Sequence, residues 1–141
     1  MASEVLVYPD PIRGFCALLD GADILGHTIA ARVIVPMDYA DSPEAVVHLS
    51  QMSTNEGSLD RTAEVRMVVY GPSVFESTDI AEAILSIITG DAIETPASDY
   101  SSEYLFDWVR QRTGPSTVDY PNANVIPVAA TFAACARPIN F

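Results

Sequence analysis

The sequence predicts an α+β fold, a mostly antiparallel sheet of four to five strands with two helices packed on one face. Three observations predict it. The chain has 141 residues, a length that suits one domain, so residues 1–141 are expected to form a single domain. Hydrophobic residues make up 49% of it and charged residues 18%, which excludes disorder and allows a sizeable core. Two segments with helical spacing of apolar residues are interleaved with strand-like segments in the order helix, three strands, helix, two strands.

The first helix is predicted from its start and stop signals. Asp10 followed by Pro11 is typical of a helix N-terminus, with a capping carboxylate and then proline at the first helical position. Gly21 is suited to ending the helix in the left-handed conformation. Gly14 inside the helix costs roughly 1 kcal/mol relative to alanine. The apolar residues at helical spacing are Ile12, Phe15, Cys16, Leu18 and Leu19.

Three strands are expected next. The segment Thr28–Val35 is rich in β-branched residues, and Ala45–Met52 forms a second apolar run. Asp60–Tyr70 alternates between apolar and polar residues, which is the pattern of a half-buried strand. The short polar segment Ser53–Gly57 is predicted to be the turn that joins the last two strands into an antiparallel hairpin.

The second helix is predicted over Val74–Thr89. It follows the turn Gly71-Pro72-Ser73, after which the hydrophobic period changes from 2 to 3.6 residues. Glu76 and other acidic residues lie toward its N-terminal end, which suits the helix dipole, and Gly90 is placed to end it. The apolar stripe consists of Val74, Ile80, Ala81, Ile84, Leu85, Ile87 and Ile88.

The last third of the chain is predicted to hold two strands and two irregular stretches. Asp91–Glu103 is interpreted as a long acidic connector, Tyr104–Thr113 as a strand, and Gly114–Asn124 as irregular. The final strand, Val125–Arg137, is apolar on both faces, so it is either central in the sheet or in contact with another subunit. Its second apolar face consists of Val125, Ala129, Ala133 and Cys135.

The chain is strongly acidic. Nineteen acidic residues stand against seven basic ones, all arginine, giving a net charge of −12 at pH 7. Binding to nucleic acid or to an anionic membrane needs clustered cations, and the sequence shows no such cluster. The acidity therefore indicates either solubility or a surface that repels or mimics DNA. Apolar runs are too short for a transmembrane helix, and no secretory signal is expected.

The sequence predicts no catalytic, metal or cofactor site. Cys16 and Cys135 are isolated on apolar stretches without a CxxC pair, which favours buried thiols in a reducing compartment. His27 and His48 have no closely spaced partner ligand, and neither a serine elbow nor a phosphate-binding loop is present. Trp108 is either an exposed aromatic anchor or part of a strand face against the core.

The order and length of the predicted elements resemble the tail terminator proteins of long, non-contractile-tailed phages. The resemblance covers most of the chain, although the acidic stretch Asp91–Glu103 is longer than in the plainest form of the pattern. The stretches that carry it are Pro11–Leu19, the hairpin Val46–Tyr70, the turn Gly71-Pro72-Ser73 with the helix to Gly90, and Asp119-Tyr120-Pro121 before Val128–Arg137.

This resemblance implies a structural role without catalytic residues. The chain is expected to form a ring, hexameric in the resemblance, that caps the head-proximal end of the tail tube, ends tube polymerisation and joins the tail to the neck. Its partners would be copies of itself, the tail tube protein and a neck or head–tail connector protein, while DNA passes through without specific binding. It would be made in the host cytoplasm and reside in the virion at the head–tail junction.

Two groups of residues are candidates for the subunit and partner contacts. Loops on a rigid scaffold usually carry function, which indicates the hairpin tip and the two irregular stretches, Asp91–Glu103 and Gly114–Asn124. The candidate residues are Thr54, Asn55, Glu56, Gly57 and Tyr120, together with Ala129, Ala133 and Cys135 on the last strand. The alternatives are another neck protein, an acidic DNA-mimic inhibitor, and an enzyme with an unrecognised carboxylate site.

Overall fold

The computed structural model describes residues 6–8, 10–32, 45–56, 60–95, 104–119 and 126–140. The helices are α1 (Pro11–Leu19) and α2 (Val74–Ile88). The strands are β1 (Leu6–Val7), β2 (Asp23–Ile24), β3 (His27–Arg32), β4 (Ala45–Glu56), β5 (Arg61–Tyr70), β6 (Gly90–Thr95), β7 (Tyr104–Thr117), β8 (Val128–Ala136) and β9 (Ile139–Asn140).

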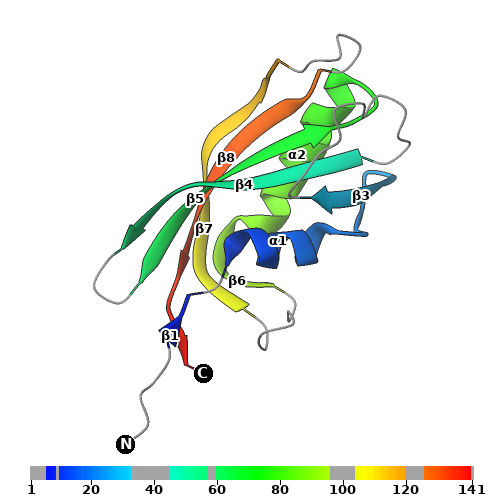
Figure 1. Ribbon diagram of the computed structural model, residues 1–141. Helices are drawn as coiled ribbons and strands as arrows, with labels where there is room; N and C mark the ends of the chain where they lie inside the picture. The colour runs from blue at the N-terminus through cyan, green and yellow to red at the C-terminus, as the bar shows by residue number, and fades with distance from the viewer. Residues whose placement is uncertain are drawn as a thin grey trace, which may run out of the picture.

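The main sheet has seven strands in the order β2-β3-β4-β5-β8-β7-β6 and curls into a half-barrel (Figure 1). The β3–β4 pair is parallel and the other pairs are antiparallel, so the sheet is mixed. β1 and β9 form a separate antiparallel pair outside the main sheet. The predicted sheet of four to five antiparallel strands is therefore wrong, because the protein is mostly β with a larger, mixed sheet.

The extra strands come from segments whose sequence carries little strand signal. β6 lies within the stretch interpreted as an acidic connector, and it pairs only with β7 at the edge of the sheet. Most of its side chains face solvent, so the strand needs no apolar alternation, and its polar composition fits a loop equally well. β2 is only two residues long, which is too short for any periodic pattern.

The two predicted helices are confirmed. The Asp10 carboxylate caps α1 by accepting a hydrogen bond from the Ile12 amide at 2.9 Å. Ser73 caps α2 in the same way through the Glu76 amide, and Gly90 follows the helix with φ +137°. α2 ends at Ile88, one residue earlier than expected.

Both helices pack into one core with the same face of the sheet. Phe15 of α1 stacks on Phe106 of β7 with ring centroids 5.0 Å apart and meets Phe132 of β8 edge-on at 5.2 Å. These three phenylalanines are almost fully buried, and they tie α1 to two neighbouring strands. The α2 residues in the same core are Ile80, Ala81, Ile84, Leu85 and Ile88.

The predicted hairpin is confirmed, but its first strand is longer than expected and its second begins one residue later, at Arg61. β4 and β5 pair antiparallel, and Val65 and Met67 of β5 point toward the helices as the alternation predicts. β4 continues to Glu56, so the part of the predicted turn from Ser53 to Glu56 is strand. A bulge lets it continue, because the register shifts between Gln51 and Ser53.

β7 also extends past its expected end, through part of the stretch interpreted as irregular. Its register against β8 shifts three times, and the last shift, between Thr113 and Ser116, brackets Gly114 and Pro115. Bulges of this kind accommodate glycine and proline within a strand. The sequence therefore suggested a loop where the structure has an irregular strand.

β8 lies between β5 and β7 and is covered on both sides. Of the two interpretations of its doubly apolar sequence, the structure supports the central strand. Ala133 and Cys135, on the face away from the helices, are 0% and 2% exposed within the single chain.

Candidate functional site

The predicted contact residues of the hairpin lie near its end. Thr54 is exposed, and its hydroxyl accepts a hydrogen bond from the Gln51 side-chain amide. Asn55 and Glu56 belong to the β4–β5 ladder, opposite Thr62 and Arg61. They are ladder residues and do not form the predicted turn, and Gly57 lies outside the described residues.

The predicted contact residues of the last strand are buried by the chain itself. Ala129, Ala133 and Cys135 are covered in the monomer, so they do not offer the surplus apolar surface that the sequence suggested. Burial raises the pKa of the Cys135 thiol above its ordinary value. Tyr120, the remaining predicted contact residue, lies outside the described residues.

Three arginines share the sheet face that points away from the helices, and we call Arg66, Arg110 and Arg112 the arginine face. Arg66 alternates with Val65 and Met67, whose side chains pack toward the helices, so it points to the opposite side. Arg110 pairs with Ala133 across β7–β8, which places it on that side too. Arg112 reaches Glu64 of β5 at 3.4 Å from Nε to Oε1.

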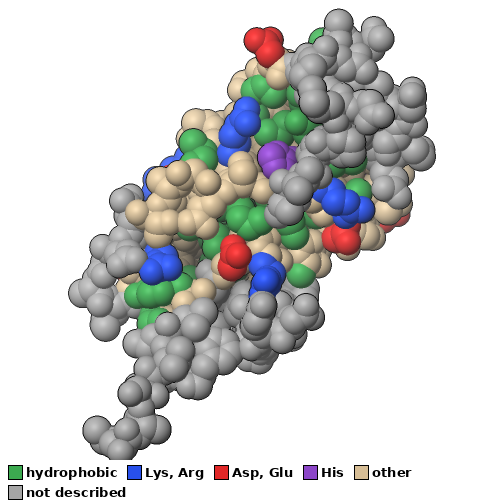
Figure 2. All heavy atoms as spheres, viewed as in Figure 1, with side chains coloured by type: hydrophobic (Ala, Val, Ile, Leu, Met, Phe, Trp, Pro, Cys, Tyr) green, Lys and Arg blue, Asp and Glu red, His purple; other side chains and the backbone are tan. Residues whose placement is uncertain are grey.

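The arginine face lies over two small residues of β8. Thr131 and Ala133 stand between β5 and β7, and Ala133 is fully buried while Thr131 is partly exposed. Arg110 is exposed, and its guanidinium lies 5.0 Å from the centre of the half-buried Trp108 ring. Figure 2 shows arginine side chains in blue on this view of the molecule, some beside green hydrophobic side chains and some beside red carboxylates, so positive charge reaches the surface of this acidic chain.

A second surface lies at the N-terminal end of α2, on the helix side of the sheet. A hollow of about 250 Å³ is lined by Leu25, His27, Glu76, Asp79 and Ile80, and we call it the α2 hollow. Glu76 Oε1 lies 3.7 Å from His27 Nε2, and Glu76 Oε2 accepts a hydrogen bond from the Ser73 hydroxyl at 3.1 Å. The hollow therefore combines two apolar walls with two exposed carboxylates.

Two large apolar side chains stand out at or beside this hollow. Leu25 is 63% exposed, and Phe75, which precedes Glu76 on α2, is 81% exposed. Leu25 has φ +53° and Gly26 has φ +80° in the tight turn between β2 and β3. Positive φ is rare for leucine, so this turn holds an exposed apolar side chain in an unfavourable conformation.

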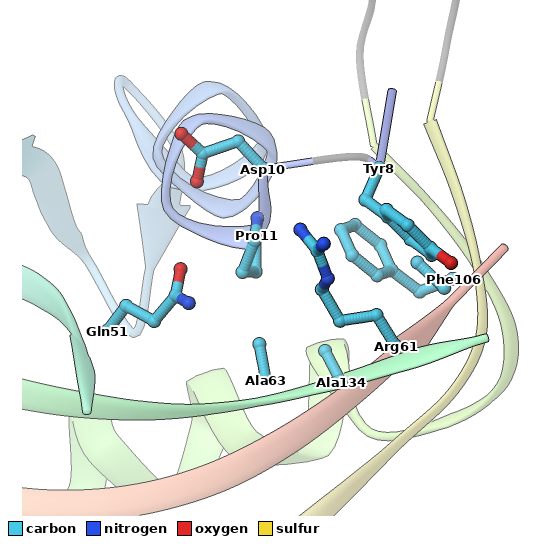
Figure 3. A pocket seen from close by; sticks show the side chains of 9 residues that line it. Tyr8, Asp10, Pro11, Gln51, Arg61, Ala63, Phe106 and Ala134 are labelled. Atoms are coloured by element: carbon cyan, nitrogen blue, oxygen red, sulfur yellow. The ribbon is translucent and has the colours of Figure 1, made fainter. Parts of the chain in front are cut away.

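A cavity of about 150 Å³ lies beneath the start of α1 (Figure 3). The Arg61 guanidinium lies over the Tyr8 ring, 4.0 Å from its centre, and the two side chains approach each other from β5 and from the segment after β1. The Asp10 carboxylate at the rim is the N-cap of α1. Tyr8, Asp10 and Arg61 thus serve the joint between the N-terminal segment and the core, while Gln51, which also lines the cavity, donates a hydrogen bond to Thr54.

The described part of the chain offers little reactive chemistry. Within it, no group of three His, Cys, Asp or Glu side chains is placed to hold a metal ion, and no helix is long and apolar enough to cross a membrane. Burial, with smaller contributions from Asp20 and Asp10, raises the pKa of Cys16 to about 11, which keeps this thiol protonated at neutral pH.

A comparison with models of known protein families and with curated protein sequences finds no match. The fold and its two surfaces are therefore what bears on the function of this chain. Sequence reasoning missed both, because each joins residues from separate elements. The only local signals were the Arg110/Arg112 pair two residues apart and the Glu76/Asp79 pair three residues apart on α2.

Proposed function

We propose that this chain is a structural protein of a long, non-contractile phage tail. It assembles as a hexameric ring on the head-proximal end of the tail tube, ends tube polymerisation and joins the tail to the neck. The observation that carries the proposal is the order of elements, in which α1 precedes a long hairpin and the hairpin leads through a short turn into α2. This is the order on which the resemblance to tail terminators rests.

The hairpin is suited to contact with another protein. Figure 1 shows the far ends of β4 and β5 extending past the two helices. Met52, the bulge residue of β4, is 59% exposed, which leaves a large apolar side chain on this arm. An extended hairpin with an exposed apolar side chain is suited to pack against a tube subunit or a neck protein.

The charge of the chain suits a channel for DNA. A net charge of −12 per chain gives a ring that repels the phosphate backbone and does not retain it. The arginine face does not contradict this, because its positive charge is available for contacts between copies.

Two experiments test the proposal. Native mass spectrometry of the purified chain should show a species of about 91 kDa, six times the 15.2 kDa chain. Electron microscopy of lysates from the parent phage, with this gene interrupted, should show tail tubes of uncontrolled length.

The second experiment separates the alternatives. Tails of normal length that fail to join heads would indicate a neck protein. Intact virions without this chain would overturn the structural role and favour the DNA-mimic inhibitor.

A further inference from the structure

We propose that the subunit contact of the ring forms between the α2 hollow of one copy and the arginine face of the next copy. This inference rests on the proposed function and adds which surfaces meet. The occupant of the hollow is then an arginine side chain of a second copy of this chain, from Arg110 or Arg112.

The chemistry of the hollow fits an arginine side chain. Leu25 and Ile80 provide apolar walls for its aliphatic stem, while the carboxylates of Glu76 and Asp79 are acceptors for its guanidinium. Because a guanidinium is planar and carries five donors, it bonds two carboxylates more effectively than a lysine ammonium does. All seven basic residues of this chain are arginine.

The arginines are available to a second copy. The Arg112 side chain is 49% exposed, and its contact with Glu64 is a surface ion pair, a kind that contributes little to stability. Arg110 is exposed beside Trp108, and arginine with tryptophan is a combination enriched where interfaces concentrate their binding energy. Moving either guanidinium into the hollow of a neighbour therefore sacrifices little within its own chain.

Charge complementarity selects a copy of the same chain as the partner. The chain has a net charge of −12, yet three of its seven arginines gather on one sheet face. The carboxylates of the hollow belong to the helix side of the sheet. Because the two surfaces differ and lie on opposite sides of the sheet, their contact is head-to-tail, and such contacts close into a ring when the rotation between copies permits.

Apolar side chains would also be buried where the α2 hollow meets the arginine face. Phe75 and Leu25 are the two most exposed of the large hydrophobic side chains in the described part of the chain, and both stand at or beside the hollow. On the other surface, Trp108 is partly exposed beside Arg110. Burial of these side chains would supply the apolar centre of the interface, while the charges supply orientation.

The test reverses the charge of each surface separately. The hollow variant carries Glu76→Arg and Asp79→Arg, and the arginine variant carries Arg110→Glu and Arg112→Glu. We expect each variant alone to lose more than tenfold in its self-association constant, measured by sedimentation over a range of concentrations, with the circular dichroism spectrum unchanged.

An equimolar mixture of the two variants should assemble again. In an alternating ring, the reversed hollow meets the reversed arginine face, and the native hollow meets the native arginine face, so every contact is complementary. Native mass spectrometry should then show equal numbers of each variant. The matched control carries Glu94→Arg on β6 and Asp119→Arg after β7, a change of the same size at exposed positions that belong to neither surface, and it should associate like the wild type.

The outcomes separate this inference from the proposed function. If neither charge reversal weakens self-association, or if the two variants do not assemble when mixed, the inference is overturned and the ring proposal still stands. A wild-type chain that stays monomeric also overturns the inference. If the mixed variants assemble into open chains or into a ring of another size, the result supports the contact and contradicts the hexamer.

Discussion

At the scale of single residues, the backbone conformation of Leu25 lowers the stability of the folded monomer, and Leu25 borders the proposed contact between copies. A positive φ at an L-residue other than glycine or asparagine costs about 1–2 kcal/mol, and Leu25 has φ +53°. Its side chain is mostly exposed, so the monomer gains little apolar burial from it. Strain of this kind tends to cluster at functional positions, which agrees with its place on the wall of the α2 hollow.

Replacing this leucine should therefore stabilise the monomer. We expect Leu25→Asn to raise the free energy of unfolding by about 1 kcal/mol, because Asn-Gly is the preferred pair for such a turn. Denaturant unfolding at low protein concentration measures the change. Leu25→Ala, which shortens the side chain without relieving the positive φ, should give no gain, and equal effects of the two variants would contradict the argument.

The Cys16 thiol should be unreactive at neutral pH. Burial, then Asp20 and Asp10, raise its pKa from 9.0 to about 11, so its alkylation by iodoacetamide should be slow at pH 8 and half-maximal near pH 11. Peptide mapping after timed alkylation measures the rate. Rapid modification at pH 8 would show that the thiol is more exposed to solvent than the structure has it.

The same shift predicts how stability depends on pH. The Cys16 thiol holds its proton more tightly in the folded chain than in the unfolded chain. Its contribution to the free energy of unfolding is therefore fully present below pH 9 and is lost as the pH rises toward 11. When the free energy of unfolding is measured at several pH values between about 9 and 11, it should fall less in a Cys16→Ala variant than in the wild type. An identical decline in the variant would assign it to other groups.

At the scale of elements, the sequence predicted those segments whose pattern is long and periodic or continuously apolar. α1 and α2 have one apolar face and capping residues, β5 alternates over its first half, and β8 is apolar on both faces. β6 was missed because it lies at an edge where only Ile93 and Thr95 turn toward the core, too few residues for an apolar alternation. The parallel pairing of β3 with β4 depends on the course of the whole chain, which local periodicity does not report.

The packing of α1 against β6 also explains Gly14, which the sequence analysis counted only as a loss of helix stability. Gly14 weakens α1 by its helix propensity, but a Cβ at that position would lie 2.8 Å from the Thr95 Oγ1 atom of β6. Thr95 is 1% exposed and has no room to move away. The glycine therefore allows α1 to approach an edge strand that the sequence did not reveal.

β8 is the element for which core and interface interpretations make opposite predictions. Because Ala133 is fully buried between β5 and β7, Ala133→Glu should lower the free energy of unfolding by about 2–3 kcal/mol, since the longer side chain has no space there and must displace its neighbours. Thermal unfolding followed by circular dichroism measures this. Thr131→Glu, two residues earlier on the same face and partly exposed, should cost only about 1 kcal/mol. An Ala133→Glu chain that remains as stable as the wild type but fails to associate would restore the interface interpretation.

At the scale of the whole molecule, two electrostatic effects oppose each other. Copies with a net charge of −12 repel one another over long distances, while the arginine face and the α2 hollow attract at contact distance. The first effect follows from composition alone. The second needed the fold, because it depends on residues of β5, β7 and α2 being gathered on two separate surfaces.

Salt should separate these two effects. The Debye length falls from about 30 Å at 0.01 M to about 8 Å at 0.15 M and about 3 Å at 1 M, so moderate salt screens the long-range repulsion and high salt also screens the contact pairs. We therefore expect self-association to strengthen between 0.01 M and 0.15 M salt and to weaken again toward 1 M, as measured by sedimentation. The arginine variant lacks the attractive pairs, so its weak association should only increase with salt. A wild-type association that falls steadily from the lowest salt would mean that attraction already dominates at long range, and one that rises throughout would mean that apolar contacts hold the copies together without the arginines.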